Sequence, residues 1–148
     1  MRWSVDGSKL AFAVAVPRHK GWAHLYGGIA SVDVDGRDFH IVARHANNQV
    51  PAAWSPHGHR LLYSRANHGG IYVIDANGRN DRRVTTDRPY ALAWSPDGSS
   101  IIYANRTGGP PTCRCELQRL YELGVDGRGK VQLTTPGTSD FDPSWVAR

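Results

Sequence analysis

The sequence lacks any run of about 18 apolar residues, which excludes a helix that spans a bilayer. Residues 1–7 lack the apolar run and cleavage site of a signal peptide, so no export signal is visible. Cysteine is scarce: the two present are Cys113 and Cys115, and a bridge at that spacing would be strained. The pair therefore leaves the redox compartment open. No segment has a helical period, which excludes long amphipathic helices.

Catalytic and metal-binding signatures are also missing. There is no Gly-x-Ser-x-Gly elbow, no His-Glu-x-x-His, no phosphate-binding loop and no dinucleotide fingerprint. Residues 57–59 (His-Gly-His) and 113–115 (Cys-Arg-Cys) lack the further ligands that zinc needs, and the acidic run 33–38 has Arg44 where a calcium loop needs Glu. We therefore predict a protein that is not an enzyme and holds no cofactor or metal. An enzyme would have to assemble its site from loop ends of several repeats.

The positive charge is modest and dispersed. The formal net charge is +5, and nearly all the basic residues are Arg, since Lys occurs only at positions 9, 20 and 130. No Lys/Arg-rich run or RNA-binding motif accompanies this charge, which disfavours nucleic acid as the ligand. The 16 Gly, 9 Pro and 9% aromatic residues are instead typical of many short strands joined by tight turns.

Three segments of the chain align without gaps: 3–12, 54–63 and 94–103. Each begins with Trp-Ser, passes through a turn and becomes an apolar run that ends in an aromatic residue. A second apolar segment that ends in Asp-Gly or Asn-Gly, a strong hairpin signal, follows at 29–36, 71–78 and 120–127. A final strand carries Val42, Val84 and Leu133 at one common distance beyond the turn glycine. Each repeat is therefore predicted to have four antiparallel strands.

Residues that recur in every repeat are predicted to be structural. The tryptophans are expected to pack between repeats rather than to bind a ligand: Trp3, Trp54, Trp94 and Trp145. Glycines in the turn after each tryptophan supply unusual backbone angles: Gly7, Gly58 and Gly98.

Similar four-stranded sheets repeated around an axis describe a β-propeller, so the predicted fold class is all-β. Within a single domain, 1–148, we place blade 1 at about 1–44, blade 2 at about 51–86, blade 3 at about 91–135 and the first strand of a further blade at 141–147. Three blades cannot close a ring, because each end blade would expose an apolar face. Either the chain is a portion of a longer propeller, which we favour because both ends cut across a repeat, or two copies self-associate into a six-bladed ring.

The repeat resembles a known family. Its Trp-Ser-Pro-Asp-Gly and later Tyr (94–103), and its Ile-Tyr-Val-Ile-Asp, Asn-Gly and Val-Thr-Thr (71–86), resemble the WD40-like propeller repeat of TolB-type proteins. Residues 140–145 resemble that family's entry into a further blade. Val5 and His57 depart from the family's Pro and Asp, but both lie in turns and leave the blade assignment intact.

The resemblance implies a non-catalytic scaffold that binds a protein or peptide, in the periplasm or another extracytoplasmic compartment. The family also implies an alternative function: an accessory propeller that gates substrates for a prolyl-oligopeptidase-type hydrolase, whose catalytic domain is absent from this chain.

Blades 1 and 3 carry insertions, because the repeat tryptophans Trp54 and Trp94 are 40 residues apart, whereas the intervals 3–54 and 94–145 are each 51 residues. Most of the extra residues lie between the second and third strands, and the rest follow the fourth. In an antiparallel meander both connections emerge on one face, which we call the loop face. We predict that the loop face holds the partner through His19, Lys20, Trp22, His24, Tyr26, Arg88, Tyr90, Arg106 and Arg114. The alternative is that these are solvated insertions with no partner.

Overall fold

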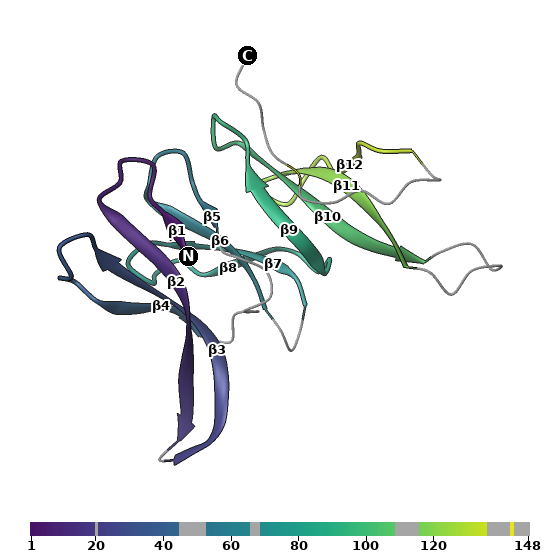
Figure 1. Ribbon diagram of the computed structural model, residues 1–148. Coiled ribbons are helices and arrows are strands. Elements are labelled where there is room, and N and C mark those ends of the chain that lie inside the picture. The colour runs from purple at the N-terminus through teal and green to yellow at the C-terminus, as the bar shows by residue number, and fades with distance from the viewer. Residues whose placement is uncertain (20, 45–52, 66–68, 109–115, 136–142, 144–148) are drawn as a thin grey trace.

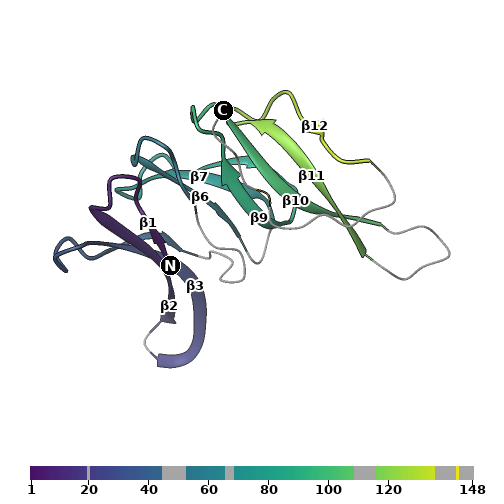
Figure 2. The same ribbon diagram turned by 45° about the horizontal axis from the view of Figure 1, so that its top comes forward.

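The computed structural model describes residues 1–19, 21–44, 53–65, 69–108, 116–135 and 143, without the side chains of 16–19, 21–26, 106–108 and 116. In these ranges its secondary structure is all strand and turn, and no helix suited to crossing a membrane occurs there. The strands form three four-stranded antiparallel sheets, each a meander in chain order (Figures 1 and 2). The predicted all-β class and four-stranded repeat are therefore confirmed.

The three sheets correspond to the three predicted blades. Blade 1 comprises β1 (Arg2–Trp3), β2 (Lys9–His19), β3 (Gly21–Asp33) and β4 (His40–Arg44). Blade 2 comprises β5 (Ala53–Trp54), β6 (Arg60–Ser64), β7 (Ile71–Asp75) and β8 (Arg82–Thr85). Blade 3 comprises β9 (Pro89–Trp94), β10 (Ser100–Gly108), β11 (Glu116–Gly124) and β12 (Val131–Gln132). Of the further strand predicted at 141–147, only Pro143 lies within the described residues.

The turn after each tryptophan is built by local hydrogen bonds. In blade 3 the backbone N–H of Ser95 donates to the carbonyl of Ser100 at 2.9 Å, and Gly98, at a φ of 72°, donates to the carbonyl of Ser95 at 3.0 Å. The Asp97 carboxylate accepts from the Ser95 hydroxyl at 2.6 Å and from the backbone N–H of Ser99 at 3.0 Å. These hydrogen bonds lower the pKa of Asp97 to about 2, because they stabilise the charged form.

The Asx-Gly turn between the third and fourth strands is longer than a two-residue hairpin turn. In blade 2 the backbone N–H of Asp75 donates to the carbonyl of Arg79 at 2.9 Å, and the Asn77 side chain accepts from the backbone N–H of Arg79 at 3.0 Å. Positive φ falls on Gly78 and on Asn80, two residues later, rather than on both members of the Asx-Gly pair. The Asx side chain closes the turn locally, so the turn differs from the two-residue hairpin turn typical of Asx-Gly, in which both central residues have positive φ.

The insertions of blades 1 and 3 are largely strand rather than loop. The ladder between β2 and β3 continues to the pair His19–Gly21, and that between β10 and β11 to Gly108–Glu116, whereas that of blade 2 ends at Ser64–Ile71. The prediction of long loops is wrong for this part of the chain. The inserted arms pair with each other because pairing satisfies their backbone N–H and C=O groups. Both hairpins extend to one side of the sheets (Figures 1 and 2).

Two apolar clusters join the blades face to face. Leu61 and Tyr63 of β6 belong to the cluster between blades 1 and 2, whereas Leu62, between them in sequence, belongs to the cluster between blades 2 and 3. All three are at most 1% exposed, as expected for a strand buried on both faces. We call the face with Leu61 and Tyr63 the leading face of blade 2, because it meets the preceding blade, and the opposite one its trailing face.

Candidate functional site

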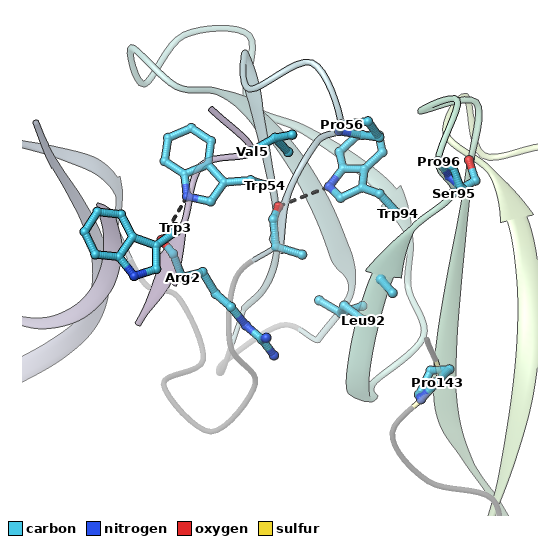
Figure 3. A pocket seen from close by; sticks show the side chains of 12 residues that line it. Arg2, Trp3, Val5, Trp54, Pro56, Leu92, Trp94, Ser95, Pro96 and Pro143 are labelled. Carbon is cyan, nitrogen blue, oxygen red and sulfur yellow. Dashed lines mark hydrogen bonds between the residues drawn. The ribbon is translucent and has the colours of Figure 1, made fainter. Parts of the chain in front are cut away.

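The first strands of the three blades border a shared hollow of about 710 Å³. Figure 3 shows tryptophan and proline side chains from successive blades around it. Its lining within the described chain is Arg2, Trp3, Val5, Ala53, Trp54, Pro56, Leu92, Ala93, Trp94, Ser95, Pro96 and Pro143. The first strand of each blade (β1, β5 and β9) is therefore the innermost strand of its sheet.

The repeat tryptophans of blades 2 and 3 each donate a hydrogen bond to a backbone carbonyl of the preceding blade. Trp54 Nε1 donates to the carbonyl of Arg2, and Trp94 Nε1 donates to the carbonyl of Ala53, each at 3.1 Å (Figure 3). Both side chains are 7% exposed, in keeping with a packing role. The acceptor in each case directly precedes the tryptophan of the neighbouring blade.

Trp3 departs from the predicted packing role. Its side chain is 55% exposed, although it occupies the same position in its repeat as Trp54 and Trp94. The physical reason is that no described sheet covers the leading face of blade 1, so the indole has nothing to pack beneath. Trp145, the fourth predicted structural tryptophan, lies outside the described residues.

The described lining of the hollow is mostly apolar. It is mainly aromatic, proline and aliphatic, and its one charged residue within the described lining is Arg2. The Ser95 hydroxyl, a possible nucleophile by type, is bound to the Asp97 carboxylate of its own turn. Aromatic-lined grooves are one kind of surface on which proline-rich peptides dock.

Blades 2 and 3 each carry a cluster of charged and tyrosine side chains. The Tyr63 hydroxyl donates to Asp81 at 2.9 Å, and Arg65 both pairs with Asp81 and lies over the Tyr72 ring, 4.1 Å from its centroid. Burial is the main cause that raises the pKa of Tyr63. This hydroxyl therefore stays protonated and acts as a donor.

Blade 3 has a similar cluster with the charges exchanged. The Tyr103 hydroxyl donates to Asp87, Lys130 Nζ donates to the same carboxylate at 2.6 Å, and Lys130 lies 4.5 Å from the Tyr121 centroid. Burial opposes ionisation of Asp87, but the hydrogen bonds from Lys130 and Tyr103 outweigh it and lower the pKa of Asp87. Both clusters thus hold a tyrosine hydroxyl against a carboxylate and act structurally.

Two of the predicted loop-face residues have described side chains. Arg88 is exposed, and its backbone N–H donates to the Asn105 side chain at 3.1 Å. Tyr90 is 43% exposed and lies at the start of β9, at the end of that strand away from the Ser95 turn. The structure therefore places both near one end of the innermost strand of blade 3.

The remaining predicted binding residues lie outside the described side chains: His19, Lys20, Trp22, His24, Tyr26, Arg106 and Arg114. Cys113 and Cys115 also lie outside the described residues. Sequence reasoning missed the hollow between the innermost strands. The recurring tryptophans were a signal for it, because residues at one position of every blade must converge on the axis.

The chain resembles known proteins over parts of their length. No protein-family model matches the chain. A WD repeat-containing protein, dyf-2 of Caenorhabditis elegans, is 29% identical over 92 residues, which is 57% of this chain and 7% of the relative. The chain thus spans a small part of the length of that relative.

Solved structures share the arrangement more completely. TolB from Acinetobacter baumannii superposes with a TM-score of 0.66 at 21% identity, over 93% of this chain and 32% of that one. The β-propeller domain of the Trilobed protease from Pyrococcus furiosus gives 0.64 at 14% identity, over 86% and 40%. The chain therefore spans less than half of either structure. These likenesses confirm the predicted resemblance at the level of fold: the three sheets are blades of a WD40-like β-propeller of the kind found in TolB.

Proposed function

We propose that this chain is a non-catalytic propeller that binds a protein or peptide on its loop face, in an extracytoplasmic compartment such as the periplasm. The observation that carries the proposal is the one-sided extension of the β2–β3 and β10–β11 hairpins beyond the hairpin of blade 2. Extensions confined to one side of a rigid scaffold are where binding residues gather.

A peptide library displayed on phage and selected on the immobilised chain tests the proposal. We expect selected peptides to lose binding to Trp22→Ala, Arg114→Ala and Tyr90→Ala, because these replacements remove aromatic or guanidinium anchors from the loop face. Arg79→Ala is the matched control, since Arg79 is exposed in the Asx-Gly turn on the opposite side of blade 2. Equal binding to all four variants would remove the loop face as the site, and the absence of any selected peptide would contradict peptide binding itself.

A second function is favoured by the likeness to the propeller domain of a protease. The chain would then be an accessory propeller that gates substrates for a hydrolase, and its own residues would perform no chemistry. A serine-hydrolase domain in the same reading frame would favour this function. Genes for envelope proteins beside an isolated propeller would favour the scaffold.

A further inference from the structure

The peptide group between Asp87 and Arg88 is hydrogen-bonded to two blades. Its carbonyl oxygen, which belongs to Asp87, accepts from the backbone N–H of Gly70 in blade 2 at 2.9 Å. Its N–H, which belongs to Arg88, donates to the side chain of Asn105 in blade 3 at 3.1 Å. The backbone from which the Arg88 side chain leaves is therefore held on both sides.

The Arg88 side chain lies on the short hairpin of blade 2. A Cβ on Gly69 would stand 3.0 Å from both Cγ and Nε of Arg88, so the stem of this arginine occupies space that a side chain at position 69 would need. Gly70 makes similar room for Arg83, whose Cδ would lie 3.2 Å from a Cβ there. Both arginines are exposed. Two exposed arginine side chains are thus packed on one pair of glycines.

Neither arginine forms an ion pair with a carboxylate of the described residues. Asp87, the acid next to Arg88 in the chain, instead accepts from Lys130 Nζ at 2.6 Å. Asp81, the acid closest in sequence to Arg83, pairs with Arg65. The neighbouring carboxylates are therefore already neutralised, and the two guanidinium groups are available to an anionic partner.

Aspartates gather instead in the turns at the opposite end of the sheets. Asp6, Asp35, Asp97 and Asp126 each accept from a backbone N–H of their own turn. These turns join the first strand to the second or the third to the fourth, whereas the loop face carries the other connections. These aspartates therefore do not offset the charge of the two arginines at short range.

The glycine pair lies beside the longer hairpins of the neighbouring blades. The hairpin of blade 2 ends its ladder at Ser64–Ile71, whereas those of blades 1 and 3 continue further on the same side (Figure 1). The two apolar clusters place blade 2 between the other two blades. A peptide that crosses the short hairpin would therefore meet both arginines and be bordered by the two longer hairpins.

We propose that the loop-face partner is an acidic peptide, whose carboxylates pair with Arg88 and Arg83 at the Gly69–Gly70 pair. This inference rests on the proposed function and specifies the chemistry of its partner. A guanidinium donates two parallel hydrogen bonds to a carboxylate, and its planar fork suits this anion better than an ammonium does. Nucleic acid fits less well, because it is held by many phosphate contacts and the chain has no Lys/Arg-rich run to supply them.

The peptides that the phage library yields on the immobilised chain test this proposal. We expect them to be enriched in Asp and Glu, and to lose binding when these residues are replaced by Asn and Gln. Arg88→Ala and Arg83→Ala should each weaken binding of a selected peptide at least about fivefold, because each removes charge-assisted hydrogen bonds. Arg79→Ala removes the same charge from an exposed turn at the opposite end, and it should leave the affinity unchanged.

Gly69→Ala tests the positioning of Arg88. It should weaken binding of the same peptide about as much as Arg88→Ala does, although the arginine is retained, because the added methyl displaces its stem. Gly58→Ala is the control: it also places alanine at positive φ, but nothing lies within 4 Å of its Cβ position. Circular dichroism checks that each variant is folded when the peptide is added. Wild-type affinity in a folded Gly69→Ala chain would overturn the role given to the glycine.

Three results would overturn the proposal of an acidic partner. Selected peptides that lack acidic residues, yet lose binding to Trp22→Ala, would contradict it and leave the proposed function standing. Acidic peptides that bind Arg83→Ala and Arg88→Ala as tightly as wild type would also contradict it. A fluorescein-labelled oligothymidylate that binds wild type but not Arg88→Ala, while acidic peptides bind no better than their amide counterparts, would favour nucleic acid instead. The absence of any selected peptide would contradict the proposed function and this inference together.

Discussion

Gly127 in blade 3 faces the carbonyl oxygen of Val84 in blade 2 so closely that a Cβ would stand 2.8 Å from it. Gly127 has a φ of 88°, so its turn conformation also disfavours a side chain. Gly58 has a φ of 71° but nothing within 4 Å of its Cβ position. The two glycines thus separate the effect of backbone angle from that of close approach.

Gly127→Ala should lower the free energy of unfolding by about 1–3 kcal/mol more than Gly58→Ala does. Both changes place alanine at positive φ, but Gly127→Ala alone also forces the blade 2 backbone to move, and such overpacking costs about that amount. Urea denaturation of the two variants measures the difference. Equal losses would mean that blades 2 and 3 do not approach at this glycine.

His40→Gln should remove a pH dependence of stability that wild type has above about pH 6.5. Bonds to the carbonyls of Ala76 and Asp38 raise the pKa of His40, because only the protonated ring donates from both nitrogens. A raised pKa gives stability that is complete below the unfolded value and is lost as pH rises through the folded value.

Thermal unfolding of wild type, His40→Gln and His59→Gln between about pH 6 and 8 makes the comparison. The exposed His59 serves as the control, and its variant should keep the wild-type slope. A slope that survives in His40→Gln would contradict a protonated bridge between blades 1 and 2.

The repeat was predictable because its signals are local. Each Trp-Ser turn is closed by bonds among neighbours, such as Ser95 with Asp97, and the glycines after it need unusual angles wherever the turn lies. These hydrogen bonds and backbone angles are determined by residues within the turn itself. The same argument explains why the strand number per blade follows from the sequence alone.

The charged clusters were less predictable. Asp81 and Lys130 occupy the same position after their turn glycines, yet one is an acid and the other a base. Asp81 pairs with Arg65, which follows β6. Lys130 pairs with Asp87, which lies between β8 and β9. The exposure of Trp3 depends likewise on what lies beside blade 1, which no pattern within the repeat encodes.

His57→Asp should raise the thermal midpoint, because blade 2 lacks the acid that caps the equivalent turns of blades 1 and 3. Asp6 accepts from the Ser4 hydroxyl at 2.6 Å and from the backbone N–H of Ser8 at 3.1 Å, and the pKa of Asp6 falls to about 2. An aspartate at position 57 would find the same donors in Ser55 and the backbone of residue 59.

The gain from His57→Asp should depend on pH in one direction. A carboxylate with a lowered pKa stabilises the fold above its unfolded value, about 4, and loses that effect as pH falls towards about 2. Melting curves of wild type and variant at neutral pH and at about pH 2 check this. His57→Asn, which caps without a charge, is the control, and a gain that is the same at both pH values would contradict the charged cap.

Lys130→Met should make acid unfolding begin at a higher pH. Bonds from Lys130 and Tyr103 hold the pKa of Asp87 below its usual 3.8 against the effect of burial. This lowered pKa stabilises the fold above 3.8, and the stability is lost as pH falls through the folded value. Without the Lys130 ammonium, burial raises the pKa of Asp87 again, so the carboxylate protonates earlier on acidification.

Arg37→Met is the control for this acid titration, because the Arg37 side chain is 85% exposed and its ion pair with Asp35, at 3.5 Å, lies in solvent. Exposed pairs of this kind contribute little to stability. Intrinsic fluorescence followed from neutral to strongly acidic pH measures each midpoint. If the two variants unfold at the same pH, Lys130 has no part in holding the Asp87 carboxylate ionised, and the cluster of blade 3 must depend on Tyr103 alone.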